Sequence, residues 1–274
     1  MTEAFRSRKA MFLAADSWAS VPYQFSAKSS HELLLDIILQ IPGLLERADQ
    51  IKLLGPTEEY WSDAQQCTNG SYSSIARYNQ AIEYLQDCDS VIQKLNHWLE
   101  SLQESENGPL WWYSKVSDLR YSKSQSILGT QSDNQSSTIH FSGSRIPGLL
   151  INYWTGLLEL CTAALEIGTS LHHISLQKIA CGTLSFQHSS MSMDADIPSK
   201  LAMRICDTAV HLGSSLEGCT MAYIPVMLAE KYFMRLLSPD YQMQYNSNSG
   251  ELHELERAQI NLEYSREVLQ TLQK

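Results

Sequence analysis

Three polar side chains stand out in the strongly apolar stretch LLINYWTGLLELCTAALEI, in the middle of the chain. Asn152, Thr155 and Glu159 recur at intervals of three and four residues, which places them on one side of a helix. Because the surrounding residues are apolar, this helix should run through the interior, where a carboxylate needs a cation, a hydrogen-bond network or a solvated cavity. Amide, hydroxyl and carboxylate oxygens are hard ligands that suit Mg²⁺. The spacing therefore predicts a magnesium site, and a core helix with a few hydrogen-bonded polar residues is the alternative.

A second acidic segment, EYLQDCD, lies on a predicted helix that spans residues 73–102. Asp87 and Asp89 flank its apolar stripe, and Glu83 shares a face with Asp87. We expect Asp87, with Asp89 beside it, to add ligands to the metal, and an ordinary solvated helix face is the alternative. A rival acidic cluster within residues 58–63 is more typical of negative charge at the start of a helix.

Other residue types would suit a diphosphate and its hydrocarbon tail. Phosphate oxygens need cations and a hydroxyl donor, for which the candidates are Arg77, Arg204, Lys231 and Tyr232. Aromatic and thioether side chains could line an apolar cavity and stabilise a carbocation, and the candidates are Trp111, Trp112, Tyr153, Trp154, Met227 and Phe233. The same side chains would serve equally well as ordinary core.

Helical periodicity accounts for the elements that must position these residues. The predicted helices cover residues 31–54, 73–102, 148–167, 199–212, 220–237 and 251–272. Ser30 stands in N-cap position for the first of them, and Pro42 should break it midway. No strand pattern of period two is evident, and residues 122–144, which are rich in Ser, Gln, Asn and Gly, predict a flexible loop that could act as a lid. The fold expected for residues 1–274 is an all-α, single-domain helical bundle with one long Ser-rich loop.

The composition narrows the classes of partner. A net charge of −10 argues against direct nucleic-acid binding, because phosphates are bound by clustered Lys and Arg. No segment is long enough to cross a bilayer, so we expect a cytoplasmic or nuclear protein that does not use a membrane. The six cysteines are scattered and indicate free buried thiols. The oligomeric state stays open, with a homo-oligomer as one outcome.

Several segments in this order resemble the C-terminal helical region of fungal zinc-cluster transcription factors. The resemblance spans most of the chain and is carried by residues 17–22, 32–45, 98–99, 152–154 and 201–233. The cluster of six cysteines that binds zinc and reads DNA in that family has no counterpart among these residues. The resemblance implies a regulatory, ligand- or partner-binding domain, or a helical scaffold recruited for chemistry.

The spacing of Asn152, Thr155 and Glu159 also resembles the second magnesium-binding motif of class I terpene cyclases. Fungal sesquiterpene cyclases of the humulene synthase kind lack the ordinary signature of that enzyme class, and this chain is similar to them in that respect. This resemblance implies a lyase that binds a prenyl diphosphate such as farnesyl diphosphate, with Mg²⁺ as its cofactor. Mg²⁺ would assist ionisation of the diphosphate, and the aromatic cavity would shield the carbocation while it cyclises. The cyclase is the first expectation, and the regulatory domain is the alternative.

Overall fold

Helices make up most of the part of the chain that the computed structural model describes, which confirms the all-α prediction. The described residues are 2–20, 27–53, 70–115, 137–180, 196–239 and 251–273. The rival acidic cluster at 58–63 and residues 122–136 of the expected Ser-rich loop lie outside these ranges. The single-domain organisation of residues 1–274 stays a prediction.

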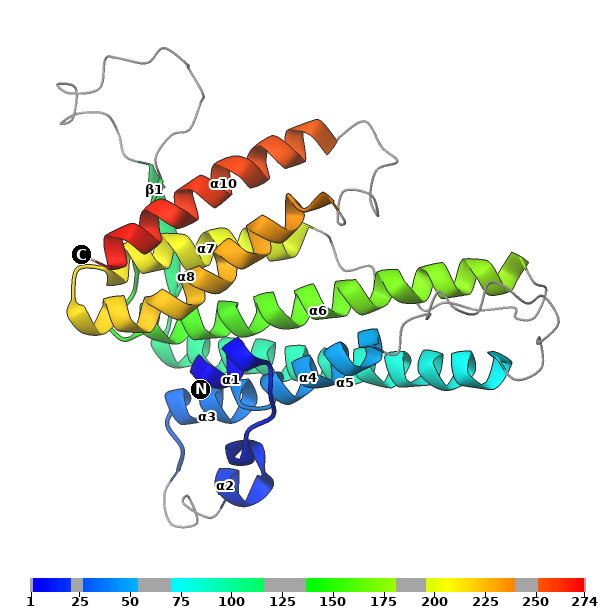
Figure 1. The fold of residues 1–274 in the computed structure, drawn as a ribbon. Coiled ribbons are helices and arrows are strands. Elements are labelled where there is room, and N and C mark those ends of the chain that lie inside the picture. Colours follow the sequence, from blue (N-terminus) through cyan, green and yellow to red (C-terminus); the bar gives the residue numbers. More distant parts are fainter. Residues whose placement is uncertain are drawn as a thin grey trace.

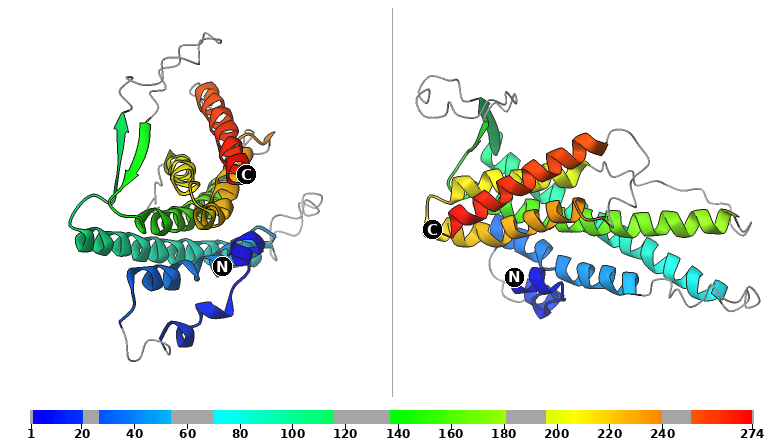
Figure 2. Two further views of the ribbon diagram at one scale, coloured as in Figure 1. Left: turned by 90° about the vertical axis from the view of Figure 1, so that its left-hand side faces the viewer. Right: turned by 45° about the horizontal axis from the view of Figure 1, so that its top comes forward.

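The long helix α6 (Ile146–Ala180) lies between two groups of helices (Figures 1 and 2). On one side it contacts α3 (Ser30–Ile38), α4 (Ile41–Leu53) and α5 (Gly70–Glu106). On the other side it contacts α7 (Asp196–Leu212) and α8 (Leu216–Leu236), and α10 (Glu251–Leu272) packs on those two. Because neighbours cover both sides, Leu150, Ile151 and Trp154 of α6 are almost completely buried, as an apolar stretch of this kind requires.

The stretch of residues 2–20 lies on the outside of this bundle. It forms two short α-helices, α1 (Thr2–Ser7) and α2 (Asp16–Ser20), with a 3-10 turn η1 (Phe12–Ala14) between them. Helix α1 packs against α4, and its Ala4 and Phe5 side chains are buried there. Helix α2 lies farther from α6 (Figure 1). Residues 2–10, which we call the N-terminal segment, are therefore anchored by few apolar side chains.

The helix ends follow local capping chemistry. Ser29, one residue before the predicted Ser30, caps α3: its hydroxyl accepts from the Glu32 backbone N–H at 3.3 Å, and the Glu32 carboxylate accepts from the Ser29 backbone N–H at 2.7 Å. The predicted break falls at residues 39–40, and Pro42 lies in the first turn of α4, where its missing N–H breaks no helical bond. Most helices run somewhat longer than predicted, and α6 extends far beyond the predicted 148–167.

The expectation that strands are absent is wrong. Strand β1 (Trp111–Lys115) pairs antiparallel with β2 (Ser137–Phe141), with Trp111 opposite Phe141. Part of the expected flexible loop, residues 137–141, is therefore a strand. The hairpin stands beside α7 (Figure 2). Trp111 packs edge-on against Trp154, while Trp112 lies on the other face and stacks on His140, as the alternation of a strand requires.

Part of α6 also has the length and composition of a membrane-spanning helix. Within the described residues, this property is found for Ile146–Thr169, a segment that the sequence analysis did not recognise as long enough. Most of it is buried among the neighbouring helices, as in the core helix of a soluble protein.

Candidate functional site

A polar stripe runs along the side of α6 that faces α4 and α8. Beyond the three residues predicted from the sequence, it continues along the same heptad spacing through Thr162 and Glu166. Glu159 is only 8 % exposed, and Thr155 is buried as well. These two side chains therefore need partners within the protein.

The two upstream side chains bond to their own helix. The Asn152 amide nitrogen donates to the Gly148 carbonyl oxygen at 2.9 Å. The Thr155 hydroxyl donates to the Ile151 carbonyl oxygen at 2.6 Å. Both bonds are the local i to i−4 kind that a polar residue makes in the middle of a buried helix. This arrangement corresponds to the alternative that the sequence left open, a core helix with hydrogen-bonded polar residues, while the magnesium role of both residues stays a prediction.

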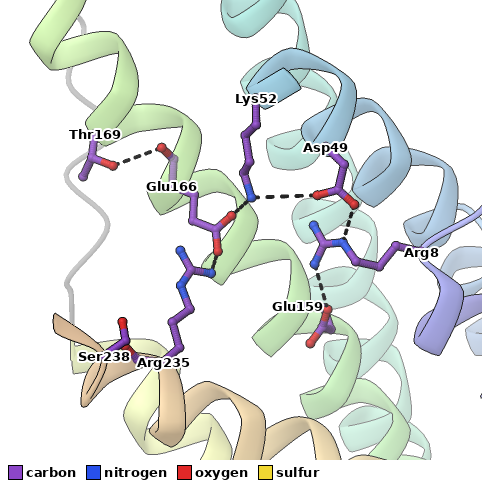
Figure 3. Close-up of polar contacts among 8 residues, drawn as sticks. All are labelled: Arg8, Asp49, Lys52, Glu159, Glu166, Thr169, Arg235 and Ser238. Atoms are coloured by element: carbon purple, nitrogen blue, oxygen red, sulfur yellow. Dashed lines mark hydrogen bonds and ion pairs between the residues drawn. The ribbon is translucent and has the colours of Figure 1, made fainter. Parts of the chain in front are cut away.

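The Glu159 carboxylate faces a cation from the N-terminal segment (Figure 3). Its Oε2 lies 3.5 Å from Nη1 of Arg8, and the Arg8 Nε donates to Oδ2 of Asp49 at 2.8 Å. Burial raises the pKa of Glu159, and the positive charges of Arg8, Lys231 and Arg235 oppose that rise. The carboxylate is therefore desolvated, and its nearest compensation is an internal guanidinium.

Further ion pairs connect this cluster to a second acid on α6. Glu166 pairs with Lys52 of α4 and with Arg235 of α8. Nζ of Lys52 also lies 3.9 Å from Oδ1 of Asp49. Figure 3 shows the resulting ion-pair chain, whose members in spatial order are Glu159, Arg8, Asp49, Lys52, Glu166 and Arg235. Acids and bases alternate along it, so the chain is electrically balanced and links α4, α6, α8 and the N-terminal segment.

Two buried polar atoms near the ion-pair chain lack hydrogen-bond partners among the described residues: Nη2 of Arg8 and the Thr162 hydroxyl. Thr162 occupies the turn of α6 between the two acids. Both groups can donate a hydrogen bond. Tyr84 on α5 hydrogen bonds with the Cys88 thiol, and the pKa of Tyr84 is raised by burial and by that thiol, while the Arg8 charge acts against the rise. The two carboxylates therefore do not satisfy the Arg8 guanidinium completely.

Asp87 and Asp89 lie on the outer side of α5. Asp87 pairs with Arg47 of α4, and its side chain is about half exposed. Asp89 accepts a hydrogen bond from the Gln93 amide at 2.6 Å. Within the part of the chain that the structure describes, no three His, Cys, Asp or Glu side chains gather in a group that could hold a metal ion. The two aspartates thus have the surroundings of a solvated helix face, and their magnesium role stays a prediction.

The described residues among those predicted to bind diphosphate have other surroundings. The Arg204 guanidinium lies over the Trp111 ring, 5.7 Å from its centroid, and the Tyr232 hydroxyl bonds to the Ser199 hydroxyl at 2.9 Å. Lys231 is exposed, and its charge reaches Glu159. Arg77 lies in α5, and its side chain is outside the described part.

Two of the predicted pocket residues pack against each other, and others contact neighbouring side chains. Trp111 meets Trp154 edge-on with ring centroids 5.4 Å apart, and Tyr232 meets Phe233 in the same manner at 5.4 Å. The Tyr153 hydroxyl donates to the Asn96 side-chain oxygen at 2.9 Å. Met227 is half-buried, and Trp112 is exposed on the hairpin. These contacts are those of a hydrophobic core with a polar border.

Sequence reasoning missed most members of the ion-pair chain. Glu166 could have been found, since it follows Glu159 at the heptad spacing of the stripe. Arg8, Asp49 and Lys52 carry no local signal, because their partners are distant in the sequence.

A second, partly buried acid was missed as well. Asp207 of α7 accepts hydrogen bonds from the hydroxyls of Tyr113 at 2.9 Å and Tyr264 at 3.2 Å. Burial raises its pKa, and the two hydrogen bonds act against that rise.

Comparison of the chain with protein-family models, with curated proteins and with solved structures gives no match.

Proposed function

We propose that this chain is a non-catalytic regulatory domain that acts by binding a partner, as its resemblance to the helical region of fungal zinc-cluster transcription factors suggests. The observation that carries the proposal is the contact of Glu159 with Arg8, which in turn is bonded to Asp49. A carboxylate that faces an internal guanidinium has less need of a metal ion than an unpaired one. The strongest candidate for catalytic chemistry in the sequence thus has a structural explanation.

The exposed surface supports the same proposal. Trp112 and Tyr113 on the hairpin and Val210 on α7 are each more than two-fifths exposed. Large apolar side chains of this kind are common at protein-binding surfaces, where aromatic residues contribute much of the affinity.

A reporter assay tests the regulatory role. We expect the full chain, fused to an unrelated DNA-binding module, to change transcription of a matched reporter several-fold relative to the module alone. The Trp112→Ala variant, whose side chain is largely on the surface, should retain the helical circular-dichroism spectrum and change the reporter less. A fusion with no effect on transcription would count against a regulatory role.

A magnesium-dependent sesquiterpene cyclase is the second candidate. It is favoured by one specific observation: a buried carboxylate, Glu159, lies on the same side of α6 as Asn152 and Thr155, with the positive charges of Lys231 and Arg235 nearby. Mg²⁺ on these oxygens would supply the positive charge that a diphosphate requires. The fit is poor, because the ion would have to displace Arg8 and the two upstream side chains already bond to the helix backbone.

Turnover separates the two candidates. Purified protein is incubated with prenyl diphosphates of several chain lengths, including farnesyl diphosphate, with and without Mg²⁺, and the headspace is analysed for hydrocarbons. The regulatory proposal predicts no product. A hydrocarbon that requires Mg²⁺, and that is lost in Glu159→Gln but retained in the surface variant Glu104→Gln, would establish the cyclase instead.

A further inference from the structure

One side chain of the N-terminal segment, Arg8, contacts two acidic residues of the bundle. Arg8 extends between α4 and α6, with its Nε on Asp49 and its Nη1 facing Glu159 (Figure 3). These two carboxylates repel each other, since the charge of Asp49 raises the pKa of Glu159. A cation between them is therefore required whenever both are ionised.

The shape of this position suits arginine better than lysine. Two different nitrogens of the Arg8 guanidinium meet two carboxylates from two helices in the fixed geometry of a planar fork, whereas Lys52 meets Asp49 and Glu166 through one nitrogen without that geometry. The third nitrogen, Nη2, is buried without an acceptor among the described residues. The position therefore recognises a guanidinium, although the Arg8 side chain does not satisfy it completely.

Among the side chains of the N-terminal segment that the structure describes, two apolar ones are buried. Ala4 and Phe5 are buried, and the Ala10 backbone N–H donates to the Glu46 carboxylate at 3.0 Å. Arg8 itself has a φ of 51°, in the left-handed region, which is strained for a residue with a side chain. Its neighbours Arg6, Ser7 and Lys9 are exposed. A competing segment with relaxed backbone geometry could replace these contacts at small net cost.

We infer that the surface around Asp49 and Glu159 is a docking site for an arginine-bearing segment of a partner protein, and that residues 2–10 occupy it in the free protein. This inference rests on the proposed function, because it names the chemistry of the bound partner. The spacing within the N-terminal segment defines the motif that fits: an aromatic residue, followed three positions later by arginine, as in Phe5 and Arg8. Displacing the segment leaves an acidic pair, which attracts a basic partner segment.

A peptide of the N-terminal segment itself, TEAFRSRKA, provides the probe. Its fluorescein-labelled form is titrated against the full-length wild type and the full-length Arg8→Ala variant, and binding is followed by fluorescence anisotropy. We expect the variant to bind about a hundred-fold more tightly, because the wild-type segment keeps the site occupied for most of the time. Lys9→Ala, which alters an exposed cation of the same segment, should bind as weakly as the wild type.

Two further arms make the result specific. The peptide TEAFRSAKA, which lacks the arginine, should not bind Arg8→Ala, and Glu159→Gln combined with Arg8→Ala should weaken binding of the original peptide. If Arg8→Ala fails to fold by circular dichroism, Arg8→Lys replaces it, since it keeps the charge and loses only the bridging geometry.

Equal binding by the wild type and the folded variant would overturn the inference. Arg8-dependent dimerisation of the wild type would also overturn it, because a second copy would then be the occupant. Failure of the peptide alongside an active reporter fusion would reject this site and leave the proposed function intact.

Discussion

A buried acid and a partly buried acid on neighbouring helices are satisfied in opposite ways. Glu159 on α6 faces a charged guanidinium from the N-terminal segment, whereas Asp207 on α7 accepts hydrogen bonds from two neutral tyrosine hydroxyls. Burial raises the pKa of both carboxyl groups. The same physical problem, a desolvated carboxylate, thus has an ionic solution in one region and a hydrogen-bonded solution in the other.

The difference indicates which region can change partners. Tyr113 comes from the hairpin and Tyr264 from α10, so Asp207 joins two elements that flank α7. The partner of Glu159 comes from a short segment with few other anchors. We therefore expect the hydrogen bonds of Asp207 to hold the hairpin and α10 to α7. We expect a competing cation to be able to replace Arg8 beside Glu159.

Removal of the Arg8 guanidinium should cause the largest loss of stability. Arg8→Ala leaves Glu159 and Asp49 without the cation between them, and we expect a loss of about 3 kcal/mol in the free energy of unfolding at pH 7.5, as for other broken buried pairs. The loss should be smaller at pH 5, where Glu159 with its raised pKa more readily takes up a proton. Urea unfolding at both pH values measures it. Lys9→Ala serves as the control, with a change within about 0.5 kcal/mol, and a loss of equal size at both pH values would contradict the role assigned to Glu159.

The pH dependence of the two acids is the next test. A carboxyl group with a raised pKa in the folded state binds protons more readily there than in the unfolded chain, so its contribution to stability is full below the unfolded pKa and falls as pH rises through the folded value. The contribution of these two acids to the stability of the wild type should therefore fall as pH rises above the ordinary carboxyl pKa. Glu159→Gln and Asp207→Asn should each reduce that loss, as measured by urea midpoints. If neither variant alters the slope, burial does not control these two groups.

Removal of one phenol hydroxyl should have the smallest effect. Tyr264→Phe deletes the longer of the two hydrogen bonds to Asp207, and we expect a cost of about 1 kcal/mol, typical of a single hydrogen bond. Tyr113→Phe deletes the shorter bond and should cost slightly more. Hydrogen exchange of the hairpin amides should accelerate in Tyr113→Phe. An unchanged free energy of unfolding in both variants would mean that the hydrogen bonds to Asp207 do not stabilise the packing of the hairpin and α10 on α7.

The fold could largely be predicted because apolar periodicity is local. The bounds of α10 agree with the predicted 251–272, and the break between α3 and α4 lies close to the proline that predicted it. The hairpin could not be predicted, since each strand has five residues and its partner lies more than twenty residues away. A short strand of mixed polarity forms because it pairs with a second strand, and its own sequence carries little signal for it.

The candidate site was predictable only in part, for the same reason. The burial of Glu159 follows from the apolar residues around it on one helix. Its partner Arg8 lies about 150 residues earlier in a segment with no helical stripe, so only the tertiary structure brings the two together. A local motif can thus indicate that a carboxylate is buried without indicating which cation it meets.

A double-mutant cycle between Arg8 and Glu159 tests the central claim most directly. The free energy of unfolding is measured for the wild type, Arg8→Ala, Glu159→Gln and the double variant at pH 7.5. If the Arg8 guanidinium compensates the Glu159 carboxylate, the two changes should be coupled by about 1 to 3 kcal/mol, with the double variant more stable than the sum of the single losses predicts. Single losses that add to within about 0.5 kcal/mol would contradict it, because Glu159 would then depend on some other partner.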